Sequence, residues 1–176
     1  MAELNRLTPE EFRDSDKIPV VVILDNIRSQ NNIGSVFRTA DAFRLEAICL
    51  CGITATPPHR EIHKTALGAT DSVTWRYFES TVEAVRQMQD AGYRIISVEQ
   101  VAGSVMLQEF MPAAGEKLAI VFGNEVNGIE DDVLALSNVA LEIPQFGTKH
   151  SINVSVAVGI VIWDIFIKMK NIFTPL

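Results

Sequence analysis

The chain has 176 residues, of which 48% are hydrophobic and 21% are charged. This length fits about one domain, and a domain of this size buries enough surface to fold without disulfide or metal staples. Two cysteines exclude a disulfide scaffold, and the polar, acidic N-terminus is typical of neither a signal peptide nor a transit peptide. The net charge of −7 argues against non-specific coating of nucleic acid, although it leaves room for a local basic groove.

Residues 1–17 are interpreted as a short N-terminal extension that precedes the main domain, residues 18–176. Thr8 is a typical helix N-cap, Pro9 suits the first helical position, and Glu11 follows the cap at the spacing of a capping box. We therefore expect a short, capped helix at the periphery of the molecule.

From residue 19 onward, apolar runs of strand length alternate with segments of helical period. Continuous apolar runs are typical of strands buried on both faces, which occur in parallel sheets covered by helices. The predicted strands are residues 19–24, 47–52, 73–78, 93–98, 118–122 and 139–143, and the predicted helices are residues 33–40, 61–68, 81–91 and 129–137. The expected fold class is therefore α/β, a single domain with a mostly parallel sheet flanked by helices.

The last predicted helix, residues 152–170, is apolar on nearly every side. A helix of this kind is buried on more than one side, so we expect it to pack against the sheet and against a second copy of the chain. The sequence thus predicts a homodimer through the C-terminal helix, with a wholly internal helix as the alternative. The longest apolar run, residues 156–163, is much shorter than the ~20 residues that cross a bilayer, so no membrane segment is expected.

Polar segments interrupt this pattern at two strand-to-helix turns. Residues 31–43 place Asn and Gly where free backbone N–H groups favour an anion, and Arg38 falls at the edge of the apolar stripe. A solvated helical arginine is the alternative interpretation of Arg38. Residues 122–128 follow a buried strand, at the end where ligands bind in α/β sheets. Their spacing matches neither the dinucleotide-binding nor the P-loop glycine pattern, and a simple tight turn is the alternative.

A third polar segment, residues 143–157, joins a predicted strand to the last helix through a glycine loop. Ser151 is placed to cap that helix, a contribution of about 1 kcal/mol. Asn153 is expected inside the first turn of a largely buried helix, where a polar amide needs hydrogen-bonding partners. Asn153 is therefore a candidate functional residue.

Together the three segments resemble the three motifs of the SpoU/TrmH family of RNA ribose 2′-O-methyltransferases, in the SPOUT superfamily. Residues 32–40 (N-I-G-S-V-F-R-T-A) follow the pattern N-x-G-x-x-x-R-T-A, and residues 123–128 (G-N-E-V-N-G) follow G-x-E-x-x-G. Residues 143–157 resemble the third motif, I-P-M-x-G followed by S-L-N-V-S-V-A, with Gln145 in place of methionine and Ile152 in place of leucine.

This resemblance implies a C-terminal trefoil knot, an obligate dimer, S-adenosylmethionine as the cofactor and RNA as the partner. A cytoplasmic location is expected, and no metal site is expected because the spacing of the cysteines and histidines matches no metal-binding pattern. The residues that the resemblance places around the cofactor are Gly123, Asn124, Glu125, Ile143, Gln145, Ser151 and Ile152. The residues that match functional positions of the family are Asn32, Arg38, Glu125, Ser151 and Asn153.

The chemistry of ribose methylation suggests roles for these side chains. The reaction needs a positioned 2′-oxygen and stabilisation of the developing alkoxide, which Arg38 would supply while it contacts a phosphate. A guanidinium pKa above about 12 makes Arg38 an awkward general base, although proton acceptance stays open. Asn32 and Asn153 would orient Arg38 or the ribose, and Ser151 would contact a phosphate oxygen.

Basic side chains near the motifs are predicted to contact RNA, with scattered surface charge as the alternative. They are Arg28, Arg38, Arg60, His63, Lys64 and Lys149. The family resemblance implies tRNA or large-subunit rRNA as the substrate, and the lack of a sizeable extension favours tRNA. The alternative functions are a non-catalytic RNA-binding module and a methyltransferase that acts on a base or a small molecule.

Overall fold

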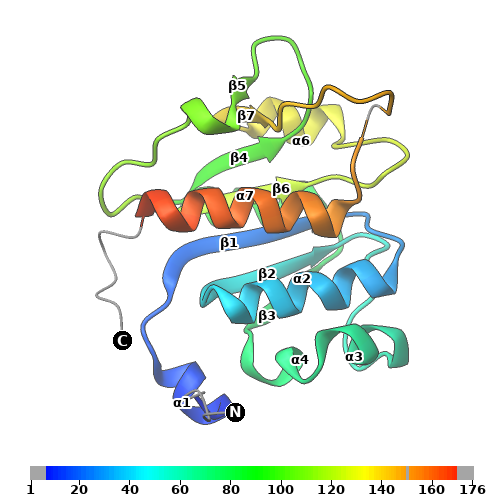
Figure 1. The fold of residues 1–176 in the computed structure, drawn as a ribbon, viewed down its shortest axis with the longest axis vertical. Helices are drawn as coiled ribbons and strands as arrows, with labels where there is room; N and C mark the ends of the chain where they lie inside the picture. The colour runs from blue at the N-terminus through cyan, green and yellow to red at the C-terminus, as the bar shows by residue number, and fades with distance from the viewer. Residues whose placement is uncertain (1–6, 150, 170–176) are drawn as a thin grey trace.

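The computed structural model describes residues 7–149 and 151–169, and its strands form one sheet in which every neighbouring pair is parallel. The strands are β1 (Ile18–Asp25), β2 (Leu45–Cys51), β3 (Trp75–Phe78), β4 (Arg94–Val98), β5 (Val105–Met106), β6 (Leu118–Phe122) and β7 (Val139–Glu142). Their order is β3-β2-β1-β6-β4-β7-β5, so β6 lies at the centre between β1 and β4 (Figure 1). The predicted parallel α/β sheet is confirmed.

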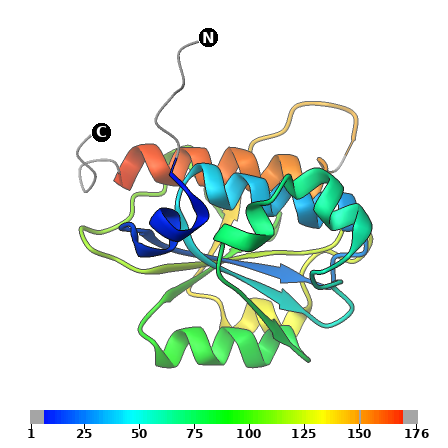
Figure 2. The same ribbon diagram turned by 90° about the horizontal axis from the view of Figure 1, so that it is seen from below.

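Helices cover both faces of this sheet (Figure 2). The helices are α1 (Pro9–Asp14), α2 (Gln30–Ala42), α3 (Arg60–Ala66), α4 (Ala69–Ser72), α5 (Thr81–Asp90), α6 (Asp131–Leu136) and α7 (Val154–Met169), with a 3-10 turn η1 (Leu107–Glu109). Alternate residues of β1 serve the two cores. Val20 and Val22 pack with the core under α2 and α7, whereas Val21 and Ile23 pack with the core under α5 and α6.

The structure adds three short elements to the predicted set. α4, β5 and η1 each contain too few residues to show a helical or strand period, so no local pattern announces them. The capping box at the first helix is confirmed, since the Thr8 N–H donates to Glu11 Oε2 at 2.7 Å and the Glu11 N–H donates to Thr8 Oγ1 at 3.2 Å. α7 begins later than expected, and its predicted end at Lys170 lies outside the described residues.

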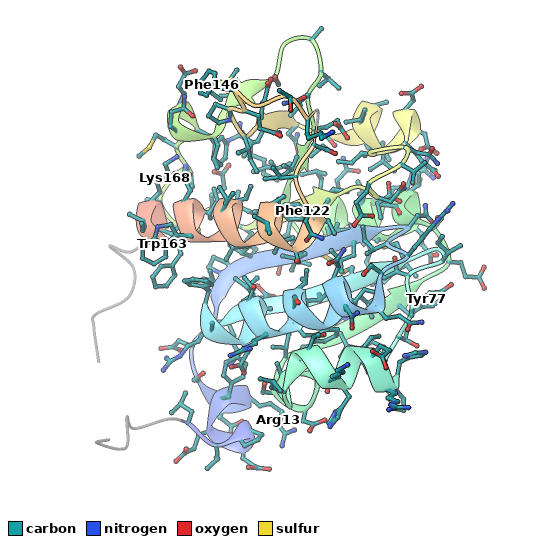
Figure 3. The ribbon with its side chains drawn as sticks, turned by 45° about the vertical axis from the view of Figure 1, so that its right-hand side comes forward. Arg13, Tyr77, Phe122, Phe146, Trp163 and Lys168 are labelled. Carbon is teal, nitrogen blue, oxygen red and sulfur yellow. The ribbon has the colours of Figure 1, made fainter. Side chains whose placement is uncertain are left out.

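α7 has one buried face and one exposed apolar stripe. The stripe consists of Val156, Ile160, Trp163 and Ile167, and the side chain of Trp163 is 53% exposed. Trp163 stands at the edge of the molecule (Figure 3), where its ring packs against Phe43 and Phe166. The alternative of a wholly internal helix is therefore wrong for this chain. Among the described residues, no helix is both long and apolar enough to cross a membrane.

Candidate functional site

The carboxyl ends of β4, β6 and β7 border a cavity of about 280 Å³, here called the strand-end cavity. Small-molecule sites in proteins measure roughly 300–1,000 Å³, and in parallel α/β sheets they lie at this edge. The lining residues are Val98, Glu99, Gln100, Phe122, Gly123, Asn124, Glu125, Gly128, Leu141, Glu142, Ile143, Gln145, Ser151, Ile152, Val154 and Ala157. All seven residues predicted to surround the cofactor line this one cavity, and their role in binding stays a prediction.

The loop between β6 and α6 is held closed by its own residues. Oδ1 of Asn124 accepts hydrogen bonds from the backbone N–H groups of Val126 at 3.1 Å and Asn127 at 2.9 Å. A Cβ at Gly123 would overlap the backbone of Gly128, and Gly128 itself has a φ of +67°, which favours glycine. The two glycines of the second motif thus allow a tight loop, and the Asn124 side chain holds it.

Side-chain hydrogen bonds join all three polar segments beside this cavity. Nδ2 of Asn153 donates to Oδ1 of Asn32 at 3.1 Å, and Nδ2 of Asn32 donates to Oε1 of Glu125 at 2.8 Å. The Asn32 amide therefore uses both its donor and its acceptor here, which fixes the orientation of its side chain. Residues predicted from separate motifs are brought together here.

Asn153, rather than Ser151, caps α7. The Asn153 carbonyl accepts from the N–H groups of Val156 and Ala157, and its Oδ1 accepts from the Ser155 N–H at 2.9 Å. The expectation that Ser151 caps the helix is wrong, as is the placement of Asn153 inside the first turn. Asparagine caps a helix as well as serine does, and the backbone before it stays non-helical along the edge of the cavity.

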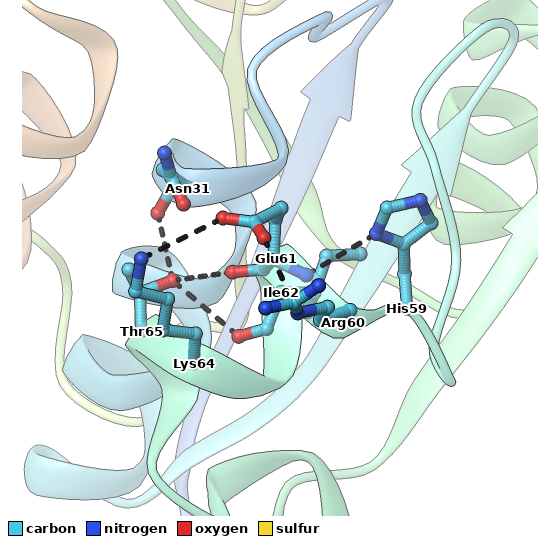
Figure 4. A network of polar contacts seen from close by, with 7 residues as sticks. All are labelled: Asn31, His59, Arg60, Glu61, Ile62, Lys64 and Thr65. Carbon is cyan, nitrogen blue, oxygen red and sulfur yellow. Dashed lines mark hydrogen bonds and ion pairs between the residues drawn. The ribbon is translucent and has the colours of Figure 1, made fainter.

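Gly34 of the first motif permits close packing of α2 on α3. A Cβ at this position would overlap the Thr65 hydroxyl and the Ile62 carbonyl oxygen. The Thr65 hydroxyl also donates to the Asn31 carbonyl at 3.0 Å, which ties α3 to the first turn of α2 (Figure 4). The glycine of the first motif is therefore a packing residue in this structure.

Arg38 lies away from the strand-end cavity. It is exposed and lines a second cavity of about 530 Å³, here called the α2–α3 groove. The groove is lined by Ser35, Arg38, Thr39, Ala42, Phe43, Lys64, Thr65 and Leu67. Two cationic side chains, Arg38 and Lys64, make this groove chemically suited to a phosphate oxygen. Within one chain, Arg38 is therefore separate from the strand-end cavity, which Glu125 and Ser151 line.

The remaining predicted RNA contacts are exposed and come from three segments of the chain. Arg60, His63 and Lys64 are exposed on α3, where Glu61 lies 3.9 Å from the Arg60 Nε and 4.0 Å from the Lys64 Nζ (Figure 4). Such exposed ion pairs are weak, so both cations stay available to a polyanion. Arg28 precedes α2 and Lys149 follows β7, and both are exposed.

Glu99 lines the strand-end cavity although no motif includes it. Its Oε2 accepts from the Ile129 N–H at 3.1 Å, and its Oε1 accepts from the Gln100 N–H at 3.0 Å. The available signal was its place directly after a predicted strand, where a carboxylate reaches the ligand-binding edge of the sheet.

The two cysteines are buried in β2, away from this cavity. Burial raises the pKa of the Cys49 thiol to about 12, and burial together with the neighbouring Cys49 raises the pKa of the Cys51 thiol. Both thiols therefore stay protonated and unreactive near neutral pH. Within residues 7–149 and 151–169, no three His, Cys, Asp or Glu side chains gather in a way that would hold a metal ion.

A parallel sheet with a ligand-sized cavity at its strand ends defines the class of α/β proteins that bind small molecules at that edge. The profile of the SpoU rRNA Methylase family matches residues 19–163, and the chain belongs to this family. The resemblance seen in the three motifs is confirmed.

Curated relatives of the chain are longer than it is. The 23S rRNA (guanosine-2′-O-)-methyltransferase RlmB of Neisseria meningitidis serogroup B is 29% identical over 144 residues, which cover 82% of this chain and 56% of the relative. The tRNA (guanosine(18)-2′-O)-methyltransferase of Borreliella burgdorferi is 24% identical over 149 residues, which cover 85% of this chain and 66% of the relative.

Solved structures share the fold. An AdoMet-bound rRNA methyltransferase from Sinorhizobium meliloti matches with a TM-score of 0.80 and 25% identity. The match covers 96% of this chain and 62% of the methyltransferase chain. The A. aeolicus TrmH/SpoU tRNA modifying enzyme matches with a TM-score of 0.80 and 21% identity. The match covers 93% of this chain and 81% of the enzyme's chain.

Proposed function

We propose that the protein is a cytoplasmic methyltransferase that moves a methyl group from S-adenosylmethionine to a ribose 2′-hydroxyl in tRNA or rRNA. The observation that carries this proposal is the hydrogen-bond chain from Asn153 through Asn32 to Glu125, which unites three motif segments beside one cavity. Family membership supports it, as do relatives whose names state 2′-O-methylation of guanosine in 23S rRNA and in tRNA.

The lining of the strand-end cavity fits S-adenosylmethionine. Phe122 and Leu141 offer apolar walls to a flat base, while Glu99, Glu125 and Glu142 bring three carboxylates to one cavity. Carboxylates attract a cation, and the cofactor carries a sulfonium charge. When bound, the cofactor supplies an electrophilic methyl group. The protein's own contribution is to bind and orient the two reactants.

The predicted catalytic side chains divide this work. Arg38 stays cationic and stabilises the developing 2′-alkoxide and a neighbouring phosphate. Asn32 and Asn153 orient the reacting group through the hydrogen-bond chain that ends at Glu125. Ser151 lines the cavity, from where its hydroxyl would contact a phosphate oxygen of the RNA.

A homodimer through α7 is part of this proposal. Its support is the exposed stripe of Val156, Ile160, Trp163 and Ile167, because contiguous exposed apolar surface marks an interface. In one chain Arg38 lines the α2–α3 groove and not the strand-end cavity. We propose that pairing across α7 brings Arg38 of one subunit to the cavity of the other.

The trefoil knot implied by the motifs also belongs to this proposal. It is supported by the described residues on either side of position 150, since Ile143 and Gln145 after β7 and Ser151 and Ile152 before α7 line the same cavity. α7 then packs on the face of the sheet that carries α2. The division into an N-terminal extension, residues 1–17, and a methyltransferase domain, residues 18–176, stays a prediction.

The test is transfer of labelled methyl from S-adenosylmethionine to unmodified tRNA and unmodified rRNA, followed by digestion to nucleosides. We expect label on the ribose 2′-oxygen. Arg38→Ala should lower transfer about 10²- to 10³-fold, as for loss of one oxyanion-stabilising donor, and leave binding of S-adenosylhomocysteine unchanged. Arg13→Ala, which removes an exposed arginine on α1, is the matched control and should retain full activity.

Other outcomes contradict the proposal in distinct ways. Label on a base, or on a small molecule alone, would replace ribose with another acceptor. Cofactor binding with no transfer to either RNA pool would favour a non-catalytic RNA-binding module. Equal loss of activity in the Arg38 and Arg13 variants would remove the specific role of Arg38.

A further inference from the structure

We propose that Glu99 is a specificity-determining residue of the strand-end cavity, whose carboxylate accepts hydrogen bonds from the two ribose hydroxyls of the adenosyl cofactor. The inference rests on the proposed function, because it takes an adenosyl cofactor as the ligand of this cavity. Beyond the proposed function, it assigns a binding role to a residue outside the three motifs and names the part of the cofactor that this residue binds, the ribose cis-diol.

The backbone holds the Glu99 carboxylate in one orientation. Its Oε1 accepts from the Gln100 N–H at 3.0 Å and its Oε2 accepts from the Ile129 N–H at 3.1 Å. A carboxylate oxygen has two lone pairs, so one acceptor site on each oxygen remains after these bonds. Two adjacent acceptors on one planar group match a cis-diol, which presents two neighbouring O–H donors.

The other two carboxylates of the cavity already have side-chain partners. Oε1 of Glu125 accepts from Asn32, and Oε2 of Glu142 accepts from the Ser104 hydroxyl at 2.7 Å. Among the described residues, Glu99 is the cavity carboxylate whose two oxygens both accept from backbone N–H groups. Its two remaining acceptor sites, one on each oxygen, are therefore held in a fixed orientation.

Gly128 makes room for this carboxylate. A Cβ at Gly128 would overlap Oε2 of Glu99, and the positive φ of this glycine already disfavours any other residue. The second glycine of the G-x-E-x-x-G segment thus lets Glu99 lie directly against the loop that borders the cavity. The missing side chain of Gly128 therefore both permits the positive φ of the loop and leaves space for the Glu99 carboxylate.

The position of Glu99 agrees with the chemistry of nucleotide sites. Glu99 directly follows β4, at the carboxyl edge of the sheet, and in dinucleotide-binding α/β sheets an acidic residue accepts from a ribose hydroxyl. The amino group of the cofactor is a second candidate donor. An ammonium group also has several N–H donors, so the experiment compares ligands with and without that group.

The experiment measures binding by calorimetry, in the whole protein, for three ligands. S-adenosylhomocysteine carries both the diol and the amino group, its 2′-deoxyribose analogue lacks one hydroxyl, and 5′-methylthioadenosine keeps the diol but lacks the amino group. Wild-type protein should bind S-adenosylhomocysteine about 10- to 100-fold more tightly than the deoxy analogue, the range for a hydrogen bond to a charged group.

Glu99→Gln should abolish most of that preference, and should weaken 5′-methylthioadenosine as much as S-adenosylhomocysteine. Glutamine keeps an acceptor for the Ile129 N–H, so the loop retains that support. Glu142→Gln removes the same charge from the same cavity and should leave the preference for ribose unchanged. Thermal unfolding of both variants checks that they fold.

Each other result overturns the inference. Equal weakening of the ribose and deoxyribose ligands by Glu99→Gln would mean that Glu99 only braces the loop. Unchanged binding of 5′-methylthioadenosine would assign Glu99 to the amino group. Equal affinity of the wild-type protein for S-adenosylhomocysteine and its 2′-deoxyribose analogue would overturn the inference, whatever the variants do. Wild-type protein that binds none of the three ligands instead overturns the proposed function, which separates the two failures.

Discussion

Asn153 and Asn32 meet through a 3.1 Å hydrogen bond from Nδ2 of Asn153 to Oδ1 of Asn32, although 121 positions separate them in the chain. The same Asn153 side chain accepts from the Ser155 N–H and so caps α7 with its oxygen. Ionised aspartate also caps helices but has no donor, and serine and threonine must accept and donate through one hydroxyl oxygen. Asparagine has a separate acceptor for the helix N-terminus and a separate donor for the other motif.

Removal of this contact should reveal coupling between the two motifs. Asn153→Ala should lower the free energy of unfolding by about 1–2 kcal/mol, because a cap and a hydrogen bond are lost together. A double-mutant cycle with Asn32→Ala should give a coupling energy of about 0.5–1.5 kcal/mol by urea denaturation. Asn31→Ala, the neighbouring position in α2, is the control. Strict additivity of the Asn32 and Asn153 variants would contradict direct contact.

A methyl group at Gly34 should separate α2 from α3. Gly34→Ala should lower the free energy of unfolding by about 1–3 kcal/mol, despite the better helix propensity of alanine, because the new Cβ overlaps Thr65 and Ile62. A Cβ at Gly147 meets nothing within 4 Å, so Gly147→Ala is the control for loss of glycine. Equal stability of the two variants would show that the helices adjust without cost.

The exposed stripe on α7 should hold two subunits together. Trp163→Glu places a charge in an apolar interface, where it has no partner, and should convert a dimer to a monomer in light scattering after gel filtration. Met111→Glu, at another exposed apolar side chain, should leave the dimer intact. A wild-type protein that is monomeric at micromolar concentration would contradict the proposed interface.

Mixed dimers should reveal whether the two subunits share a site. Arg38→Ala lacks the cation, and Ile143→Arg places a long charged side chain in the strand-end cavity, so each variant alone should be inactive. After subunit exchange, half of the dimers are mixed and each has one intact site if Arg38 acts across the interface. Activity should then recover to about one quarter of wild type. If subunit exchange restores no methyl transfer, Arg38 acts together with the cavity of its own chain.

The buried thiols should make stability fall at alkaline pH. The pKa of Cys49 is raised to about 12 in the folded protein, whereas unfolded thiols titrate near ~8.5. Above that pH the unfolded chain holds fewer protons than the folded one, so the free energy of unfolding falls by up to about 1.4 kcal/mol per pH unit for each thiol. Urea unfolding between about pH 8.5 and 10 measures the slope. Cys49→Ala should have a shallower slope, and an unchanged slope would contradict the assignment.

Local patterns in the sequence determined the α/β class and most of its elements. The apolar run at residues 118–122 coincides with β6, and the alternation of such runs with helical stripes required a sheet covered on both faces. The capping box at Thr8 was also legible, because both its partners lie within one helical turn. The resemblance of the motifs to the family implied the seven cofactor residues that line the strand-end cavity.

Tertiary structure decided what depends on distant partners. Asn32 and Glu125 are 93 positions apart, and only the strand order that places β6 beside β1 brings them within hydrogen-bonding distance. Packing of α2 against α3 sets Arg38 in a groove of its own, and the path of the chain into α7 gives the cap to Asn153 instead of Ser151. Periodicity reports burial and local hydrogen bonds. It carries no information on which strands become neighbours, and that neighbourhood creates the site.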